Sequence, residues 1–395
     1  MKRTNTFNLN PTKEQESRLF KLADNCSRMY NEINYKRRQS FFGGEIDWNT
    51  AQLYKKYIRV VGSATAQQII IKNNEAWKSF FFLFKGKKQG KLPENIKKIG
   101  VPGYWKDRKT GERDLRILIR NNCYKLRGDI LKLPFKLEIK WRGRNKWYGK
   151  QGRLEIAYDR LSRKWYAFQP VLVTPAHQPT KNKKAYVDLG VKVPIMAWIP
   201  GERIFGYRAN SMLADWWYLN HRIAEHQSTL KEVNNRHTSK HLSKLYRKRQ
   251  RRFRSHMNRI IKDFVKVCWH KGVSYIICGD LRNIRDSAKF NKKANSMIHN
   301  FWSIGYILKR LKEKSEGYGI KVTPVDERET SSVCPRCQSK HMVKRKRLFK
   351  CLDCKLEAHR DAVGSVNIGL AQGESFTSAG VINRVVTRPS LSNVA

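Results

Sequence analysis

Acidic side chains are scarce in this sequence. Its 395 residues include 32 Asp and Glu against 82 Lys and Arg, a formal net charge of +50. Such an excess repels itself in the free protein and attracts a polyanion, which predicts nucleic-acid binding that weakens steeply with salt. A membrane-surface protein and a solubilising charge excess are the alternatives. Nucleic acid is favoured because the cations run along the whole chain with aromatic residues (11%) mixed among them.

Long apolar runs are also missing. No stretch of about 18 apolar residues exists, so we expect no membrane partner, and the start, Met1-Lys-Arg-Thr-Asn-Thr-Phe7, contains no apolar signal core. The eight cysteines do not resemble a secreted disulfide framework. Four of them are scattered without a partner at metal-ligand spacing, and we expect packed, inert thiols there: Cys26, Cys123, Cys268 and Cys278. These features predict a reducing compartment, the cytoplasm, with association to the nucleoid.

The first half of the chain predicts helices followed by strands. Residues 1–10 are expected to form a strand with Thr4, Phe7 and Leu9 on its buried side. A helix should follow Thr12, which has Gln15 three residues on in capping-box spacing. In a helical region at 48–90, core packing accounts for most of a dense aromatic cluster, and stacking of one or two rings on unpaired bases is the alternative. Residues 115–175 largely alternate with period two, which predicts a small β-barrel or sandwich.

The second half predicts a different succession. After a linker at 174–183, three strands at 184–190, 194–199 and 203–207 precede a helical region at 211–270. A strand at 274–278, another helix and a strand at 320–325 follow, so the order is βββ-α-β-α-β, then a helix at the end. This is the RNase H-like succession. A basic stripe in the long helical region is expected to contact phosphate, with a solvated face as the alternative: Arg247, Lys248, Arg249, Arg251, Arg252 and Arg254.

Four cysteines have the spacing of a structural zinc site. Cys334 and Cys337 form one C-x2-C pair, and Cys351 and Cys354 form a second after thirteen residues. Four thiolates leave no open position, which predicts a structural rather than a catalytic Zn²⁺. The loop between the pairs is basic and is a second candidate for nucleic-acid contact: Lys344, Arg345, Lys346 and Arg347.

Two carboxylates stand on either side of the cysteines. Asp188 ends the first strand of the RNase H-like succession, and Asp361 begins its last helix. RNase H-like sites gather carboxylates from such positions. There, two Mg²⁺ ions about 3.5–4 Å apart activate water and stabilise the leaving oxygen of a phosphodiester.

Five motifs lie along the chain: Leu9-Asn-Pro-Thr-Lys-Glu-Gln15, Tyr30-Asn31, Asp188-Leu-Gly190, Thr330-Ser-Ser-Val-Cys-Pro-Arg-Cys337 and His359-Arg-Asp-Ala-Val-Gly-Ser-Val-Asn-Ile368. With them, nearly the whole chain resembles the TnpB family, the RNA-guided nucleases of insertion sequences, which are relatives of miniature type V CRISPR effectors and Fanzor proteins.

The resemblance implies an α/β multi-domain fold with an RNase H-like (RuvC) nuclease domain. Its parts would be a wedge strand at 1–10, a helical recognition lobe at 11–114, a wedge β-barrel at 115–175, RuvC at 176–330, a zinc-ribbon module that binds target nucleic acid at 331–356, the last RuvC helix at 357–372 and a disordered tail at 373–395.

One departure concerns the middle catalytic residue, which in the family is usually Glu at the end of the fourth strand. Here that position is Gly279. Glu327 follows the fifth strand, and neighbouring strands lie about 4.8 Å apart, so its carboxylate could fill the space left by Gly279. We therefore expect Asp188, Glu327 and Asp361 to be catalytic and to hold two Mg²⁺ ions. The other candidates for the middle carboxylate are Glu329, Asp326 and Asp280, or these acids only pair with nearby Lys and Arg.

The function implied is that of a transposon-encoded, RNA-guided DNA endonuclease. It would act as one protein per guide RNA, with the guide transcribed from the transposon end, on double-stranded DNA next to a short flanking motif. A nuclease-dead, RNA-guided DNA-binding repressor is the second hypothesis. A zinc-ribbon DNA-binding protein without guide RNA is the third.

Overall fold

The computed structural model describes residues 1–92, 96, 98–107, 110–280, 295–326, 332–376 and 386–388. The chain divides into two compact units, Met1–Thr174 and Pro175–Ala395. Within the described residues, no helix combines the length and apolar character needed to cross a membrane.

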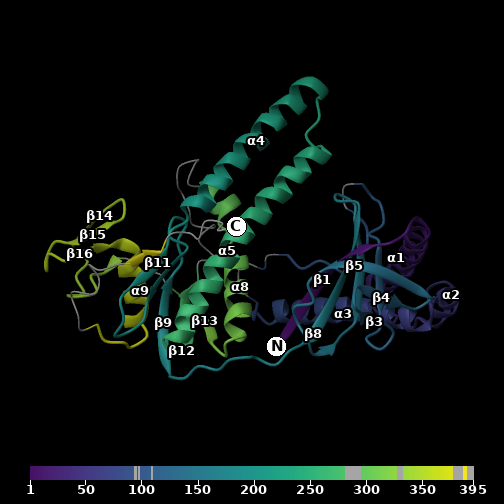
Figure 1. Ribbon diagram of the computed structural model, residues 1–395, viewed down its shortest axis with the longest axis horizontal. Helices are drawn as coiled ribbons and strands as arrows, with labels where there is room; N and C mark the ends of the chain where they lie inside the picture. The colour runs from purple at the N-terminus through teal and green to yellow at the C-terminus, as the bar shows by residue number, and fades with distance from the viewer. Residues whose placement is uncertain are drawn as a thin grey trace. The chain divides into compact units, whose positions relative to one another are not determined.

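The first unit is an open, half-barrel antiparallel sheet packed against three helices (Figure 1). Its strands are β1 (Lys2–Asn10), β2 (Arg116–Ile119), β3 (Lys125–Arg127), β4 (Ile130–Leu133), β5 (Leu137–Gly143), β6 (Lys150–Gln151), β7 (Leu154–Asp159) and β8 (Lys164–Leu172). Its helices are α1 (Lys13–Phe42), α2 (Ala51–Val61) and α3 (Ser63–Lys88). The sheet runs β2-β7-β8-β1-β5-β4-β3, and β6 pairs with β8.

The first strand and helix test two predictions. The capping box is confirmed: Thr12 Oγ1 accepts from the Gln15 amide at 3.3 Å, and Gln15 Oε1 accepts from the Thr12 amide at 3.0 Å. The assignment of Thr4 to the buried side of the first strand is wrong. Asn5, Phe7 and Leu9 are buried instead, because side chains alternate along a strand and Thr4 is out of phase with Phe7 and Leu9.

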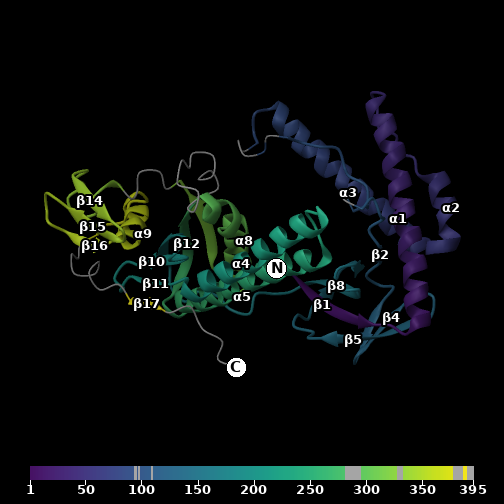
Figure 2. The same ribbon diagram turned by 90° about the horizontal axis from the view of Figure 1, so that it is seen from above.

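The second unit is a six-stranded mixed sheet in the order β13-β12-β9-β10-β11-β17. Its strands are β9 (Lys183–Asp188), β10 (Ile195–Trp198), β11 (Phe205–Tyr207), β12 (Val273–Gly279), β13 (Lys321–Val325) and β17 (Val386–Arg388). Helices α4 (Asn210–Asn234) and α5 (Lys240–His270) form a long hairpin (Figure 2). A π-helical turn η1 (Met297–Phe301), α8 (Ile304–Glu316) and α9 (Arg360–Leu370) complete the helices among the described residues.

The two faces of this sheet have different cores. Ala185 and Val187 of β9 pack with residues of α5 and α8 on one face. Tyr186 of β9, with Met196 and Trp198 of β10, packs with α9 on the other. A small antiparallel sheet, β14 (Met342–Arg345), β15 (Leu348–Cys351) and β16 (Glu357–His359), lies beside α9 (Figure 1).

Two segments expected to be loose make contacts. In the predicted linker, the ring of His177 stacks on Tyr318 with centroids 4.9 Å apart, and Trp269 Nε1 donates to the Gln178 carbonyl at 3.0 Å. At the start of the predicted tail, Glu374 accepts from Tyr186 Oη at 2.5 Å. β17 pairs in parallel with β11. The described parts of both segments are therefore attached to the second unit.

Candidate active site and its cysteine module

Three parallel strands end at the same level in the second unit. Val187 of β9 is in register with Cys278 of β12, and Gly279 is in register with Val325 of β13. The Asp280 amide donates to the Val325 carbonyl at 2.7 Å, which extends this pairing. Asp188, Gly279 and Val325 therefore lie side by side at the carboxyl ends of adjacent strands.

Helix α9 brings Asp361 to the end of β9. Asp361 is the second residue of α9 and is only 6% exposed. A Cβ at Gly364, one turn further on, would lie 2.8 Å from Asp188 Oδ2, and one at Gly190 would lie 4.0 Å from Asp361 Oδ2. The missing side chains of Gly364 and Gly190 let α9 approach the strand closely. The structure thus places the predicted Asp188 and Asp361 at one contact between α9 and β9.

Asp361 has a cation as its partner. Arg347 Nη1 donates to both carboxylate oxygens of Asp361, each at 2.7 Å. Arg347 follows Lys346, whose positive φ of 53° turns the chain from β14 into β15. Arg347 was predicted only as a cation for nucleic-acid contact, and its pairing with Asp361 was not predicted. The sequence shows only that an Arg lies in the cysteine loop. An ion pair between a hairpin and a helix leaves no spacing pattern from which the contact could be predicted.

His359 stands at the N-cap of α9. Its Nδ1 accepts from the Asp361 amide at 3.3 Å. Burial lowers the pKa of His359, and the charges of Arg347 and Arg208 lower it further against the opposing effect of Asp361. The imidazole is therefore neutral near pH 7 and serves as an acceptor that fixes the start of α9.

The middle carboxylate position has no acid on its own strand. Gly279 occupies the end of β12. Asp280 is half-buried and Asp326 is exposed. Glu327 and Glu329 lie outside the described residues.

The four cysteines form one cluster. All four Sγ atoms lie within 4.8 Å of one another, and Cys334–Cys354 and Cys337–Cys351 are 3.5 and 3.6 Å apart. A tetrahedral Zn²⁺ with Zn–S bonds of about 2.3 Å would need sulfur atoms about 3.8 Å apart. Gln338 and Lys355, which directly follow the two C-x2-C pairs, share a positive φ of 57°. The two turns are thus alike, and the cluster could hold a tetrahedral metal ion.

The thiols of this cluster differ in acidity. Burial raises the pKa of Cys334 to about 12. Burial also raises the pKa of Cys351, but the amides of Cys354 and Asp353 outweigh it and lower the pKa to about 7. Burial therefore favours the neutral thiol of Cys334, whereas the neighbouring backbone amides favour the thiolate of Cys351.

The cysteine module and helix α9 share one core. Cys334, Phe349 and Cys351 pack in the same buried cluster as Ala362 and Val363 of α9. The Arg360 amide donates to the Arg347 carbonyl at 2.8 Å, and Asn367 Nδ2 donates to the Val333 carbonyl at 2.8 Å. The position of Asp361 therefore depends on the fold of the module.

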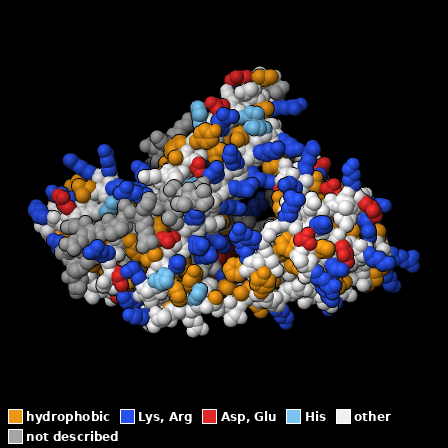
Figure 3. All heavy atoms as spheres, viewed as in Figure 1, with side chains coloured by type: hydrophobic (Ala, Val, Ile, Leu, Met, Phe, Trp, Pro, Cys, Tyr) orange, Lys and Arg blue, Asp and Glu red, His pale blue; other side chains and the backbone are white. Residues whose placement is uncertain are grey.

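Lys and Arg side chains are scattered over the visible surface of the molecule and outnumber acidic side chains there (Figure 3). On α5, Lys248, Arg251, Arg252 and Arg254 are exposed. Arg247 and Arg249 are half-buried, and Arg249 bonds to Asn220. In the module, Arg345 and Lys346 are exposed, whereas burial lowers the pKa of the half-buried Lys344. Most of the predicted cations are thus available to a polyanion.

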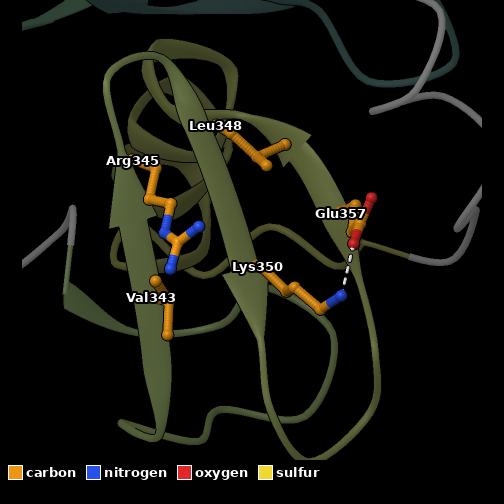
Figure 4. Close-up of a pocket in the computed structure, with 5 residues that line it drawn as sticks. All are labelled: Val343, Arg345, Leu348, Lys350 and Glu357. Atoms are coloured by element: carbon orange, nitrogen blue, oxygen red, sulfur yellow. Dashed lines mark ion pairs between the residues drawn. The ribbon is translucent and has the colours of Figure 1, made fainter.

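A shallow pocket of about 330 Å³ lies on the module's sheet (Figure 4). Its lining residues are Val343, Arg345, Leu348, Lys350 and Glu357. Lys350 Nζ pairs with Glu357 Oε1 at 2.7 Å, whereas Arg345 lies beside Val343. The pocket combines one ion pair, one further cation and an apolar surface.

Comparisons with known proteins agree with this arrangement. Residues 168–285 match a family described as probable transposase, and residues 305–368 match the Cas12f1-like TNB domain. The TnpB-like protein ORF457 of Acidianus two-tailed virus is 35% identical over 366 residues, which cover 84% of this chain and 79% of that protein. A TnpB-like protein of Methanocaldococcus jannaschii is 29% identical over 121 residues, covering 30% of this chain and 42% of that protein.

Solved structures share the fold at low identity. A Cas12f1–sgRNA–target DNA complex matches with a TM-score of 0.60 and 14% identity over 90% of this chain and 83% of that one. The mini-RNA-guided endonuclease CRISPR-Cas_phi3 matches with a TM-score of 0.52 and 11% identity over 97% and 93%. The predicted fold class, an α/β multi-domain protein with a RuvC-like domain and an inserted zinc ribbon, is confirmed. With a relative 35% identical over most of both chains, this chain belongs to the TnpB family.

Proposed function

We propose that this protein is a transposon-encoded, RNA-guided DNA endonuclease with a RuvC-type site. The observation that carries the proposal is the meeting of Asp188 and Asp361 at the contact between β9 and α9. One solved structure with this fold is a Cas12f1–sgRNA–target DNA complex, which supports guide RNA and target DNA as partners of this chain.

The alternation of side chains supports Glu327 as the third carboxylate. Tyr186, Ile277 and Val325 pack in the core on the α9 face of the sheet. Asp188 and Gly279, each two residues further along, belong to that face. In the sequence, Glu327 is two residues beyond Val325, the same spacing that separates Asp188 from Tyr186 and Gly279 from Ile277. Asp280 and Asp326 are out of phase with these residues and fall on the opposite face. Glu329 is two residues further along the sequence than Glu327.

The donor set suits Mg²⁺, which prefers carboxylate oxygens. Asp188, Glu327 and Asp361 would hold the metal. In the metal-free structure, Arg347 provides the positive charge that pairs with the buried carboxylate of Asp361. Two bound Mg²⁺ ions would activate the attacking water and stabilise the leaving oxygen. The chain's own contribution is to hold Asp188 and Asp361 on rigid elements.

We further propose Zn²⁺ in the cysteine cluster, where it would stabilise the module that positions Asp361. The exposed cations of α5 and of the β14–β15 hairpin would contact the phosphates of guide and target. A short duplex motif beside the target and one protein per guide RNA complete the proposal.

Expression with the native flanking sequence of the element tests the proposal. We expect a defined RNA to co-purify with the protein. This RNA should direct Mg²⁺-dependent cutting of a DNA whose sequence pairs with the end of the RNA. Stable RNA-free protein that recognises DNA unaided would contradict it.

The second candidate is an RNA-guided repressor without nuclease activity. The absence of an acid at Gly279 favours it. Guide-directed binding without cutting, under Mg²⁺ or Mn²⁺, would establish this function instead.

A further inference from the structure

The segment between β5 and β6 in the first unit has an unusual burial pattern. Its even-numbered side chains are exposed, whereas Asn145 and Trp147 between them are half-buried. The outward row consists of Arg142, Arg144, Lys146, Tyr148 and Lys150. Tyr148 is 74% exposed. An aromatic ring is thus presented to solvent among four cations.

Acidic residues are missing from the sequence immediately around these cations. Residues 139–154 contain six Lys and Arg and no Asp or Glu. Within the described part of the chain, none of the four outward cations forms an ion pair. The row therefore offers its full positive charge to a ligand.

A buried amide holds the segment in shape. Asn5 of β1 is 2% exposed, and its Nδ2 donates to Asn145 Oδ1 at 2.7 Å and to the Trp147 carbonyl at 2.8 Å. Asn5 Oδ1 accepts from the Lys146 and Trp147 amides at 3.1 and 3.0 Å. Gln169, which faces Asn5 on β8 and is 5% exposed, accepts a further bond at 3.1 Å. A buried amide is costly unless its bonds are made, and here most of them go to this one surface segment.

Both ends of the segment depend on glycine. Gly143 has φ 138°, and Gly149 has φ 154° with its missing Cβ only 2.1 Å from the Leu172 carbonyl oxygen. Arg3 lies over the Trp147 ring at 5.7 Å. The segment is a fixed turn that holds Tyr148 outward in place before any ligand arrives.

We propose that this segment is a preformed binding site for an unpaired nucleotide of a single-stranded nucleic acid. Tyr148 stacks on the base, and Arg144, Lys146 and Lys150 contact the flanking phosphates. Asn5 acts as a positioning residue that cannot reach the ligand. An exposed aromatic with surrounding cations is the arrangement by which proteins bind single strands without reading their sequence. The inference rests on the proposed function only for the presence of nucleic acid and not for cleavage.

Photo-crosslinking of the full-length chain tests this site. The Asp188→Ala background removes nuclease activity as a variable. The probes are an oligouridine RNA and an oligothymidine DNA, each about 12 nucleotides long, with one 5-iodopyrimidine. We expect the cross-link to map to Tyr148 by mass spectrometry. A cross-link with RNA alone or with DNA alone identifies the strand that is bound.

Variants separate stacking from charge. Tyr148→Ala should weaken probe binding at the cross-linked site between about fivefold and about 150-fold, while Tyr148→Phe retains it. Lys146→Ala should lower the salt dependence of binding by about 0.7 in slope, and Tyr148→Ala should leave that slope unchanged. Tyr35→Ala is the control, because Tyr35 is also exposed (57%) but lies on α1. Asn5→Ala, if folded by circular dichroism, should reduce the cross-link.

Cross-links that map elsewhere, with Tyr148→Ala binding like the parent, would overturn the inference. Equal losses in Tyr148→Ala and Tyr35→Ala would overturn it as well. Binding of an acidic protein with no cross-link to either oligonucleotide would assign the surface to another class of partner.

Discussion

Replacement of Gly364 by alanine should damage catalysis without damaging the fold. The new Cβ would lie 2.8 Å from Oδ2 and 3.2 Å from Cγ of Asp188. Close C···O contacts in proteins are about 3.3 Å, so the carboxylate must retreat by about 0.5 Å. That atom is the end of a side chain at the strand terminus and can move at little cost. The substitution also removes a helical glycine, which favours α9 by up to about 1 kcal/mol.

The expected result is therefore a split between activity and stability. A displacement of 1 Å in a reacting group can cost about 100-fold in rate, so we expect a roughly 10- to 100-fold loss in single-turnover cleavage. Stability, measured by denaturant unfolding, should change by less than about 1 kcal/mol, and guide-directed DNA binding should not change. Gly305→Ala is the matched control, since its Cβ meets nothing within 4 Å on α8. Cleavage by Gly364→Ala at the wild-type rate, or an equal loss of cleavage rate in Gly305→Ala, would refute this reasoning.

Three further predictions concern the structure around the site. Elemental analysis should find about one zinc per chain in wild type and none in Cys334→Ser. In wild type the zinc affinity should fall at least about tenfold per unit of decreasing pH, because the raised pKa of the Cys334 thiol means that a proton must leave when zinc binds; a pH-independent affinity would contradict this. Arg347→Ala should destabilise the metal-free protein by about 1–2 kcal/mol, because the buried Asp361 carboxylate loses its partner while Arg347 itself is partly solvated. Mn²⁺ should then stabilise this variant more than wild type in thermal melts; equal stabilisation would argue against Arg347 as the cation that takes the place of the metal. Gly369→Ala should destabilise by about 1–3 kcal/mol, since its Cβ would lie 2.4 Å from the Trp198 ring; unchanged denaturant unfolding would contradict the packing of α9.

Some features could be predicted because their chemistry has a fixed spacing. The two C-x2-C pairs predict one cluster wherever the chain folds, and the four sulfur atoms do meet. The capping box at Thr12 and Gln15 is equally local. The fold class followed from the succession of strands and helices together with the family motifs.

Other features depend on contacts between distant segments. Arg347 reaches Asp361 across a hairpin, and Asn5 holds a loop about 140 residues away in the sequence. His177 fixes a segment whose composition resembles a linker. Thr4 was placed on the wrong face because a short strand with few apolar residues gives a weak phase. The contacts of Arg347, Asn5 and His177 are made by tertiary packing and leave no periodic pattern in the sequence.

The central claim is that Asp188 and Asp361 form a nuclease site served by a guide RNA. It is tested most directly by single-turnover cleavage of a guide-matched DNA by wild type, Asp188→Asn and Asp361→Asn, with binding measured on the same samples. We expect Mg²⁺-dependent cutting by wild type, no cutting by either variant, and equal guide-directed binding by all three. Cutting by a variant at the wild-type rate, or no cutting by wild type with any divalent metal, would contradict the claim.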